Sequence, residues 1–423
     1  MKVLLVGGGG REHAMLHAIH RSPRVDKIYV APGNAGMADM AELVPIGVME
    51  FDKLIAFAKE KEIDLTVCSQ DDPLCAGIVD AFEAAGLKIF GTRKNAAIIE
   101  GSKAFSKDLM KKYGIPTARY EVFTDPAEAI SYLETQPMPI VLKADGLALG
   151  KGVLICQTLE EAKAGVKTIM EDKKFGNAGN ELVIEEFMTG REVSALAFVD
   201  GSHYALMTSS QDHKRAGDGD TGLNTGGMGT FSPSPFFTEE IRKICDKEIF
   251  QPTVDAMKKE GREFRGVLYF GLMLTKEGPK VVEYNTRFGD PETQVVLPRM
   301  KTDIIDVFEA CMNGSLDKIH LEFSDNAAVC VVLASKGYPV SYEKGFPISG
   351  LDRFDNQNYF CFHAGTKFDE KGQIVTNGGR VLGVTALGKD LKEARANAYQ
   401  ATEWVNFANK YMRHDIGKAI DEA

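Results

Sequence analysis

Glu283 and Asn285 are the residues whose types and spacing most directly indicate chemistry, and they directly follow Val281 and Val282. This pattern predicts a strand, on which residues two apart point to the same face. A carboxylate beside an amide oxygen suits a hard cation such as Mg²⁺, which also binds nucleotide phosphates. Arg287 would share that face if the strand continued, and its guanidinium could stabilise a phosphoryl group in transfer. The two valines disfavour the alternative, an exposed polar strand face.

A second candidate is Lys143, which ends an apolar strand and precedes a glycine-rich stretch that runs to Gly152. A lysine at a strand end can reach phosphate oxygens, and a loop of glycines can close over them. The stretch is not a Walker A loop, because Gly152 stands where that motif requires Ser or Thr. A hairpin with a solvated lysine fits these residues equally well.

Residues 212–229 combine charges of both signs with many glycines and almost no apolar side chain. Such a segment cannot be a core element, and a flexible linker would not need so many different polar groups. Its place between expected strands predicts a substrate-binding loop.

A glycine turn, Gly7-Gly8-Gly9-Gly10, follows the first strand and opens a helix at Arg11. Such a turn favours an anion at the helix N-terminus. Dinucleotide binding is disfavoured, because Glu12 occupies the third glycine position of the GxGxxG fingerprint. A tight turn without a ligand remains open.

A zinc site is a weaker alternative in the same helix. His13, His17 and His20 fall on one helical face. The spacing lacks the internal glutamate of HExxH, and no fourth ligand is evident.

Strands alternate with helices over residues 1–101, which predicts a doubly wound parallel α/β domain. A larger α+β block at 102–325 follows, with a small lid at about 120–190, and a small C-terminal domain is expected at 326–423. The expected helices are 11–21, 51–60, 72–85, 103–113, 159–170 and 391–411. The expected strands are 3–6, 27–30, 64–68, 88–90, 139–143, 153–156, 181–186, 193–199, 266–274, 280–284 and 326–333.

The composition limits the class of protein. The chain has 423 residues, 44% hydrophobic and 26% charged, with a formal net charge of −10. These values are typical of a globular protein, and the acidic balance disfavours nucleic acid as a partner. Seven scattered cysteines indicate a reducing compartment, and no apolar run is long enough for a membrane span. We therefore predict a cytoplasmic protein without a membrane partner.

The run Arg287-Phe288-Gly289-Asp290-Pro291-Glu292-Thr293-Gln294 resembles the signature of the phosphoribosylamine–glycine ligases, a family of ATP-grasp enzymes. Segments 9–14, 32–36 and 212–229 are similar to that family in the same order, so the resemblance spans the chain. It implies an N-terminal α/β domain, an ATP-grasp core with a mobile lid, and a small C-terminal domain.

The resemblance also implies roles for individual residues. The implied ATP-binding residues are Lys103, Lys143, Gly150, Gly152, Glu185, Glu186 and Glu192. The implied substrate-binding residues are Gly8, Gly9, Gly10, Arg11, Glu12, Asn34, Lys214, Asn224, Thr225, Gly226, Arg287, Asp290 and Pro291. Glu283 and Asn285 are the implied ligands of Mg²⁺ or Mn²⁺, and Arg287, Lys143 and Asp212 are the implied catalytic residues.

The implied reaction joins glycine to 5-phosphoribosylamine with ATP, through a glycyl phosphate, in de novo purine biosynthesis. Its products are glycinamide ribonucleotide, ADP and phosphate. The alternative is another ATP-grasp ligase with a different carboxylate substrate, and no obligate protein partner is indicated. The sequence departs from the family pattern at Leu223, where proline is common, and at Ser69-Gln70, where Gly-Pro is common.

Overall fold

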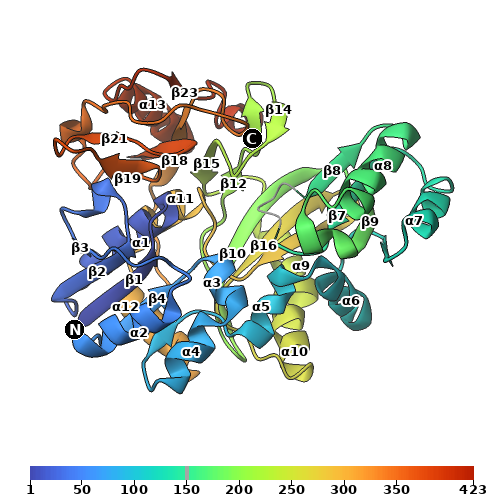
Figure 1. Cartoon of the computed structure of the whole chain (residues 1–423), viewed down its shortest axis with the longest axis horizontal. Coiled ribbons are helices and arrows are strands. Elements are labelled where there is room, and N and C mark those ends of the chain that lie inside the picture. The colour runs from blue at the N-terminus through green and yellow to red at the C-terminus, as the bar shows by residue number, and fades with distance from the viewer. Residues whose placement is uncertain (148–151) are drawn as a thin grey trace.

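The computed structural model describes residues 1–147 and 152–423 (Figure 1). The N-terminal part contains a five-stranded sheet in the order β3-β2-β1-β4-β5, and every neighbouring pair is parallel. Its strands are β1 (Lys2–Gly7), β2 (Lys27–Pro32), β3 (Glu42–Leu43), β4 (Leu65–Cys68) and β5 (Ile89–Phe90). Its helices are α1 (Gly10–His20), α2 (Phe51–Glu60), α3 (Asp71–Ala76) and α4 (Ile78–Ala84). The predicted parallel α/β fold is therefore confirmed.

The single helix expected at 72–85 is wrong. It is divided into α3 and α4 at Gly77, whose φ of +97° is left-handed and ends the first helix. Glycine adopts this conformation without a steric penalty, so the chain turns there.

The lid is an antiparallel four-stranded sheet in the order β6-β9-β7-β8. Its strands are β6 (Tyr120–Phe123), β7 (Ile140–Ala144), β8 (Val153–Cys156) and β9 (Leu182–Glu186). It follows α5 (Lys94–Gly101) and α6 (Lys103–Tyr113). The sequence predicted one helix here, whereas the lid has α7 (Pro126–Leu133) as well as α8 (Leu159–Val166). Asp125 caps α7 and Pro126 opens it, so the missed helix did carry a start signal.

The central sheet has the order β11-β10-β16-β17 and is antiparallel. Its strands are β10 (Arg191–Asp200), β11 (Tyr204–Leu206), β16 (Arg265–Thr275) and β17 (Gly278–Asn285). The associated helices are α9 (Glu239–Cys245), α10 (Gln251–Lys259), α11 (Thr293–Val296) and α12 (Ile304–Asn313). Because β17 ends at Asn285, Arg287 lies beyond the strand, and the condition for its place on the strand face is not met.

A six-stranded sheet forms the C-terminal part, in the order β12-β15-β18-β22-β19, with β23 paired to β18. Its strands are β12 (Gln211–Asp212), β15 (Gly229–Ser232), β18 (Ala327–Ser335), β19 (Tyr359–His363), β22 (Arg380–Gly388) and β23 (Lys410–Tyr411). The helix expected at 391–411 is too long, because α13 (Leu391–Thr402) ends well before β23. Two strands from the segment at 211–232 complete this sheet.

Residues 212–229 form more than a loop. Between β12 and β15 the chain makes a small antiparallel hairpin of β13 (Arg215–Gly217) and β14 (Thr221–Asn224). The hairpin β20 (Thr366–Phe368) and β21 (Ile374–Thr376) is a similar ribbon in the C-terminal part. Met228, beside β15, is fully buried, so the expectation that this segment avoids the core fails at its end.

Among the described residues, none of the helices has both the length and the apolar composition needed to span a bilayer. All seven cysteines are free thiols, and six of them are buried.

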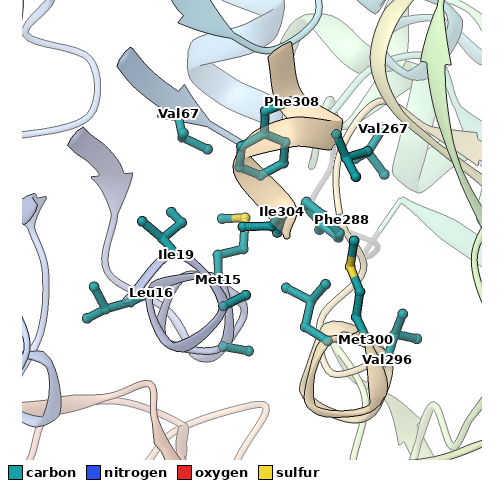
Figure 2. Packing of buried hydrophobic residues seen from close by; sticks show 14 of the residues in the cluster. Met15, Leu16, Ile19, Val67, Val267, Phe288, Val296, Met300, Ile304 and Phe308 are labelled. Carbon is teal, nitrogen blue, oxygen red and sulfur yellow. The ribbon is translucent and has the colours of Figure 1, made fainter. Parts of the chain in front are cut away.

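One hydrophobic core joins the N-terminal sheet to the central sheet, as Figure 2 shows. Met15 and Ile19 of α1 face Phe308 of α12, and Val267 of β16 lies on the other side. The rings of Phe308 and Phe90 stack with their centroids 4.0 Å apart. This shared packing fixes the first glycine turn relative to the strand that carries Glu283.

We expect Phe308→Ala to lower the free energy of unfolding by roughly 3–5 kcal/mol, because it opens a cavity between two sheets. The matched control is Phe368→Ala, since the Phe368 residue is 45% exposed and should cost much less. Urea denaturation followed by fluorescence would measure both. Equal losses in the two variants would contradict the shared core.

Candidate active site

A cavity of about 1050 Å³ lies between the lid, the central sheet and the C-terminal part. Most of the residues singled out in the sequence meet on its wall. They are Lys143, Glu185, Glu186, Glu192, Asp212, Lys214, Asn224, Thr225, Gly226, Glu283, Asn285, Arg287 and Asp290.

Glu185 at the end of β9 shares its carboxylate between two lysines. The Nζ atom of Lys143 lies 3.0 Å from one carboxylate oxygen, and that of Lys107 lies 3.2 Å from the other. All three side chains are buried, and burial lowers the pKa of Lys107 to about 8. Two cations around one carboxylate leave a net positive charge, which suits an anionic phosphate ligand.

Lys103 at the start of α6 points to the glycine loop. Its Nζ donates to the carbonyl of Gly146 at 2.7 Å, and burial lowers the pKa of this lysine. Asp145 accepts from the backbone N–H of Ala104 at 3.0 Å, which fixes the residue after β7 to the N-terminus of α6. Gly152 is buried beside β7, and Gly150 lies outside the described residues. Neither Lys103 nor Gly152 is among the residues that line the cavity.

Glu186, next to Glu185, points toward a different partner. Its carboxylate accepts from the backbone N–H of Arg119 at 2.9 Å and from the Arg119 Nε at 2.8 Å. Burial acts to raise the pKa of Glu186, but these hydrogen bonds lower it below its ordinary value. The adjacent carboxylates therefore bind different partners: Glu185 binds two lysines, and Glu186 binds Arg119.

Glu283 and Asn285 lie on one face of β17, as predicted, and both line the cavity. The Nζ atom of Lys214 lies 3.3 Å from a Glu283 oxygen and 3.3 Å from a Glu192 oxygen. Lys214 lowers the pKa of Glu283 to about 2, so this carboxylate is ionised at neutral pH. The pKa of Lys214 is raised by Glu192 and then by Glu283.

The Asn285 amide fits this arrangement when its nitrogen donates to Oε1 of Glu100 at 2.9 Å. Its oxygen then faces neighbouring donors. An ionised carboxylate and an amide oxygen on one strand face make a donor set that fits a hard divalent cation.

Arg287 approaches the same site from the loop after β17. Its Nη2 lies 3.4 Å from Oε1 of Glu100, and Glu100 also accepts from the Thr286 backbone N–H at 2.7 Å. Burial raises the pKa of Glu100. Glu100 thus anchors both the arginine loop and the Asn285 amide.

Two aspartates on the other side of the cavity have opposite pKa shifts. The pKa of Asp212 is raised well above its ordinary value by burial and by the nearby Glu292. Burial also acts to raise the pKa of Asp290, but Arg380 and Arg11 outweigh it and the net shift is downward. Asp290 is therefore held in its ionised form, whereas Asp212 binds a proton more tightly than an ordinary aspartate does.

Arg380 of β22 connects three parts of this wall. Its Nη1 donates to the carbonyl of Gly226 at 2.9 Å and to that of Asp290 at 3.0 Å, and it lies 3.4 Å from an Asp290 carboxylate oxygen. The cis Asp290–Pro291 peptide follows Gly289, and Pro291 itself does not line the cavity.

The glycine turn before α1 is fixed by its own side chains. Glu12 accepts from the backbone N–H of Gly9 at 2.8 Å and from Nε of Arg11 at 2.8 Å. Asn34 donates to the carbonyls of Gly8 at 2.9 Å and His363 at 2.8 Å. The carboxylate and the amide are therefore engaged within the protein.

Gly8, Gly9, Gly10, Arg11, Glu12 and Asn34 do not line the large cavity. Their proposed contact with phosphoribosylamine remains a prediction. The structure disfavours the zinc alternative, because the Nδ1 of His13 accepts from the His363 backbone N–H at 2.7 Å and His20 is exposed.

Comparison with protein families matches three successive parts of the chain to the domains of one family. Residues 1–100, 101–293 and 328–419 match the N domain, the ATP-grasp (A) domain and the C domain of phosphoribosylglycinamide synthetase. The chain belongs to the phosphoribosylglycinamide synthetase family.

Individual relatives cover nearly all of the chain. The phosphoribosylamine–glycine ligase of Caldanaerobacter subterraneus subsp. tengcongensis is 50% identical over 98% of this chain and 99% of its own. That of Salmonella typhimurium is 49% identical over 100% and 99%. The crystal structure of phosphoribosylamine–glycine ligase from Thermotoga maritima is 35% identical, covers 99% of this chain and 100% of its own, and superimposes with a TM-score of 0.86.

Both departures from the synthetase family pattern can be located. Leu223 is 57% exposed in β14, on the hairpin beside the cavity. The Ser69 hydroxyl accepts from the backbone N–H of Phe288 at 2.9 Å and so supports the loop that carries Arg287. A serine at this position supplies a contact that a glycine could not.

Sequence reasoning missed Lys107, Glu100, Asp145 and Arg380. Lys107 lies four residues after Lys103 in the same helix, so helical spacing could have placed both lysines on one face. Glu100 and Arg380 carried no local signal, because their partners lie far away in the sequence.

We expect Lys107→Met to weaken the binding of Mg·ATP about tenfold, which corresponds to about 1.4 kcal/mol. Glu185 would then pair with Lys143 alone, and this lysine would be less available to phosphate. Calorimetric titration with Mg·ATP measures the change. Lys111→Met is the control, because Lys111 is exposed one turn further along α6. Unchanged affinity in Lys107→Met would contradict a role for the shared carboxylate.

Proposed function

We propose that this protein joins glycine to 5-phosphoribosylamine at the expense of ATP, giving glycinamide ribonucleotide, ADP and phosphate. The observation that carries the proposal is that a single cavity collects Lys143, the Glu283–Asn285 pair, Arg287 and the hairpin at 212–226. Two relatives with identities of 49% and 50% over nearly the full chain bear the name phosphoribosylamine–glycine ligase. That full-length identity disfavours a ligase for another carboxylate.

The first step is the transfer of the γ-phosphoryl group of ATP to glycine. A carboxylate oxygen of glycine attacks the γ-phosphorus, the bond to the β,γ-bridging oxygen breaks, and ADP leaves. Lys143 and Lys103 would hold the phosphates, and Arg287 would meet the charge on the group in transfer. The reaction requires no protein nucleophile, because the glycine carboxylate itself attacks the phosphorus. The protein contributes positioning and charge neutralisation.

The second step forms the amide bond. The amine of phosphoribosylamine attacks the carbonyl carbon of glycyl phosphate, phosphate leaves with the electron pair of the broken bond, and the nitrogen loses a proton. Asp212, on the cavity wall, would receive that proton in its ionised form, and a pKa raised by burial and by Glu292 makes that form a stronger base. Lys214, Asn224, Thr225 and Gly226 lie on the same wall and would position the substrates.

Glu283 and Asn285 would hold the divalent cation, Mg²⁺ or Mn²⁺. When bound, such a cation would neutralise charge on the nucleotide phosphates. Lys214 keeps Glu283 ionised, and Glu100 orients the Asn285 amide. These two neighbours therefore prepare the donor set for the cation.

An acyl phosphate reacts readily with water, so the cavity has to exclude water. The lid strands β7 and β9 contribute Lys143, Glu185 and Glu186 to the wall, so closing the lid would bring the phosphate ligands and the water barrier together. We place the reaction in the cytoplasm, a reducing compartment that suits seven free thiols.

Phosphate release from Mg·ATP should require both glycine and freshly generated phosphoribosylamine. Glu283→Ala should lower the rate at least about 100-fold, because it removes a ligand of the cation. The control is Glu277→Ala at the exposed turn before β17, which should retain activity. Release with a carboxylate other than glycine would overturn the named substrate, and full activity of Glu283→Ala would overturn the metal site.

A further inference from the structure

A segment near the C-terminus, residues 410–422, lies against the hairpin of β13 and β14. Figure 1 shows the C-terminus beside β14. The side chain of Arg413 in this segment is 1% exposed, and it pairs with Asp415 through Nε at 2.8 Å and Nη2 at 2.9 Å. Its remaining contacts reach the hairpin: Nη1 donates to the Arg215 carbonyl at 3.0 Å, and Nη2 lies 3.0 Å from Oδ1 of Asp220.

Other groups of the segment reinforce this contact. Asp415 accepts from the backbone N–H of Gly219 at 2.8 Å, and the Tyr411 hydroxyl donates to the carbonyl of Ala216 at 2.6 Å. The backbone N–H of His414 donates to Asp218 at 2.7 Å. The segment therefore contacts β13 and the turn that connects β13 to β14.

The base of the hairpin is held by Lys214, which pairs with Glu192 and Glu283, but its second strand is open to solvent. All four residues of β14 are exposed, and a two-stranded ribbon is marginally stable by itself. Its base nevertheless carries Lys214 and Asn224, which line the cavity, and Arg413 and Asp415 line the same cavity. At its far end the segment is tied to β10, where Arg191 lies 2.6 Å from Glu422.

We propose that Arg413 is a positioning residue, which acts through Asp415 and Asp220 to hold the hairpin where Lys214 and Asn224 can meet the substrates. The part about substrates rests on the proposed function. Arginine suits this position because its planar fork satisfies a carboxylate, a carbonyl and a second carboxylate at once. A lysine could not make the same set of bonds, so Arg413→Lys should behave as a loss of function.

The test compares Arg413→Gln, Arg413→Lys and Asp220→Asn with the control Glu83→Gln. The Asp220 side chain is 74% exposed, so its substitution weakens the contact without burying a new group. Glu83 accepts from Nε of Arg93 at 2.8 Å and from its Nη2 at 3.1 Å, in the N-terminal part, and therefore controls for an arginine–carboxylate pair remote from the segment and the hairpin. Thermal unfolding identifies any variant that fails to fold.

The first readout is limited trypsin cleavage after Lys214 and Arg215, which needs no substrate. We expect cleavage about fivefold or more faster in Arg413→Gln and Arg413→Lys, faster to a smaller degree in Asp220→Asn, and unchanged in Glu83→Gln. The second readout is steady-state kinetics. The KM for glycine or for phosphoribosylamine should rise about tenfold in the Arg413 variants, while the KM for ATP stays within about twofold.

Unchanged cleavage in Asp220→Asn and the Arg413 variants would overturn the proposal. Faster cleavage with unaltered KM values would also overturn it, because the hairpin would then move without effect on the site. If the wild-type protein used neither glycine nor phosphoribosylamine, the proposed function would fall. The cleavage rates would still decide whether Arg413 holds the hairpin.

Discussion

The constraint on which the site depends is that charges removed from water must be paired. Glu185 meets this constraint by sharing its carboxylate between Lys107 and Lys143, and in doing so it joins α6, β7 and β9. Lys214, which is less buried, has the inverse arrangement and lies between the carboxylates of Glu192 and Glu283. Each cation is thus held in place by carboxylates, at positions where anionic phosphates and a carboxylate substrate can be met.

The loop after β17 links this chemistry to the packing of the molecule. Phe288 is fully buried in the core shared by the N-terminal and central sheets, while its neighbour Arg287 points to Glu100 and lines the cavity. Two residues later, Asp290 binds Arg380 of the C-terminal sheet. One short segment therefore fixes three parts of the protein relative to one another, which explains why its sequence is so distinctive.

Much of the fold follows from local pattern. Apolar strands alternating with helices indicated the parallel sheet, and the glycine after Tyr113 ended α6 as expected. Two of the errors had different physical causes. Gly77 broke a helix whose pattern was otherwise continuous, and the expected helix at 391–411 gave way to β23 because Lys410 and Tyr411 pair with the distant β18. Sheet partners of this kind are set by the tertiary structure.

The residues of the site also divide into those that local sequence could identify and those that depend on the tertiary structure. The spacing of Glu283 and Asn285 on one strand was sufficient to place them on one face, and the structure puts both on the cavity wall. Lys107, Glu100 and Arg380 could not be identified this way, because each acts on a residue from a different part of the chain. Local sequence thus identified groups that line the cavity better than the groups that hold them in place.

The central claim is that this cavity activates a carboxylate by phosphorylating it. The most direct measurement follows ¹⁸O from carboxyl-labelled glycine during turnover with Mg·ATP and phosphoribosylamine. An acyl phosphate requires one labelled oxygen to move into inorganic phosphate for each amide formed, which mass spectrometry of the released phosphate would detect. Phosphate that carries no label would contradict the account, because the carboxylate oxygen would then never have been bonded to phosphorus.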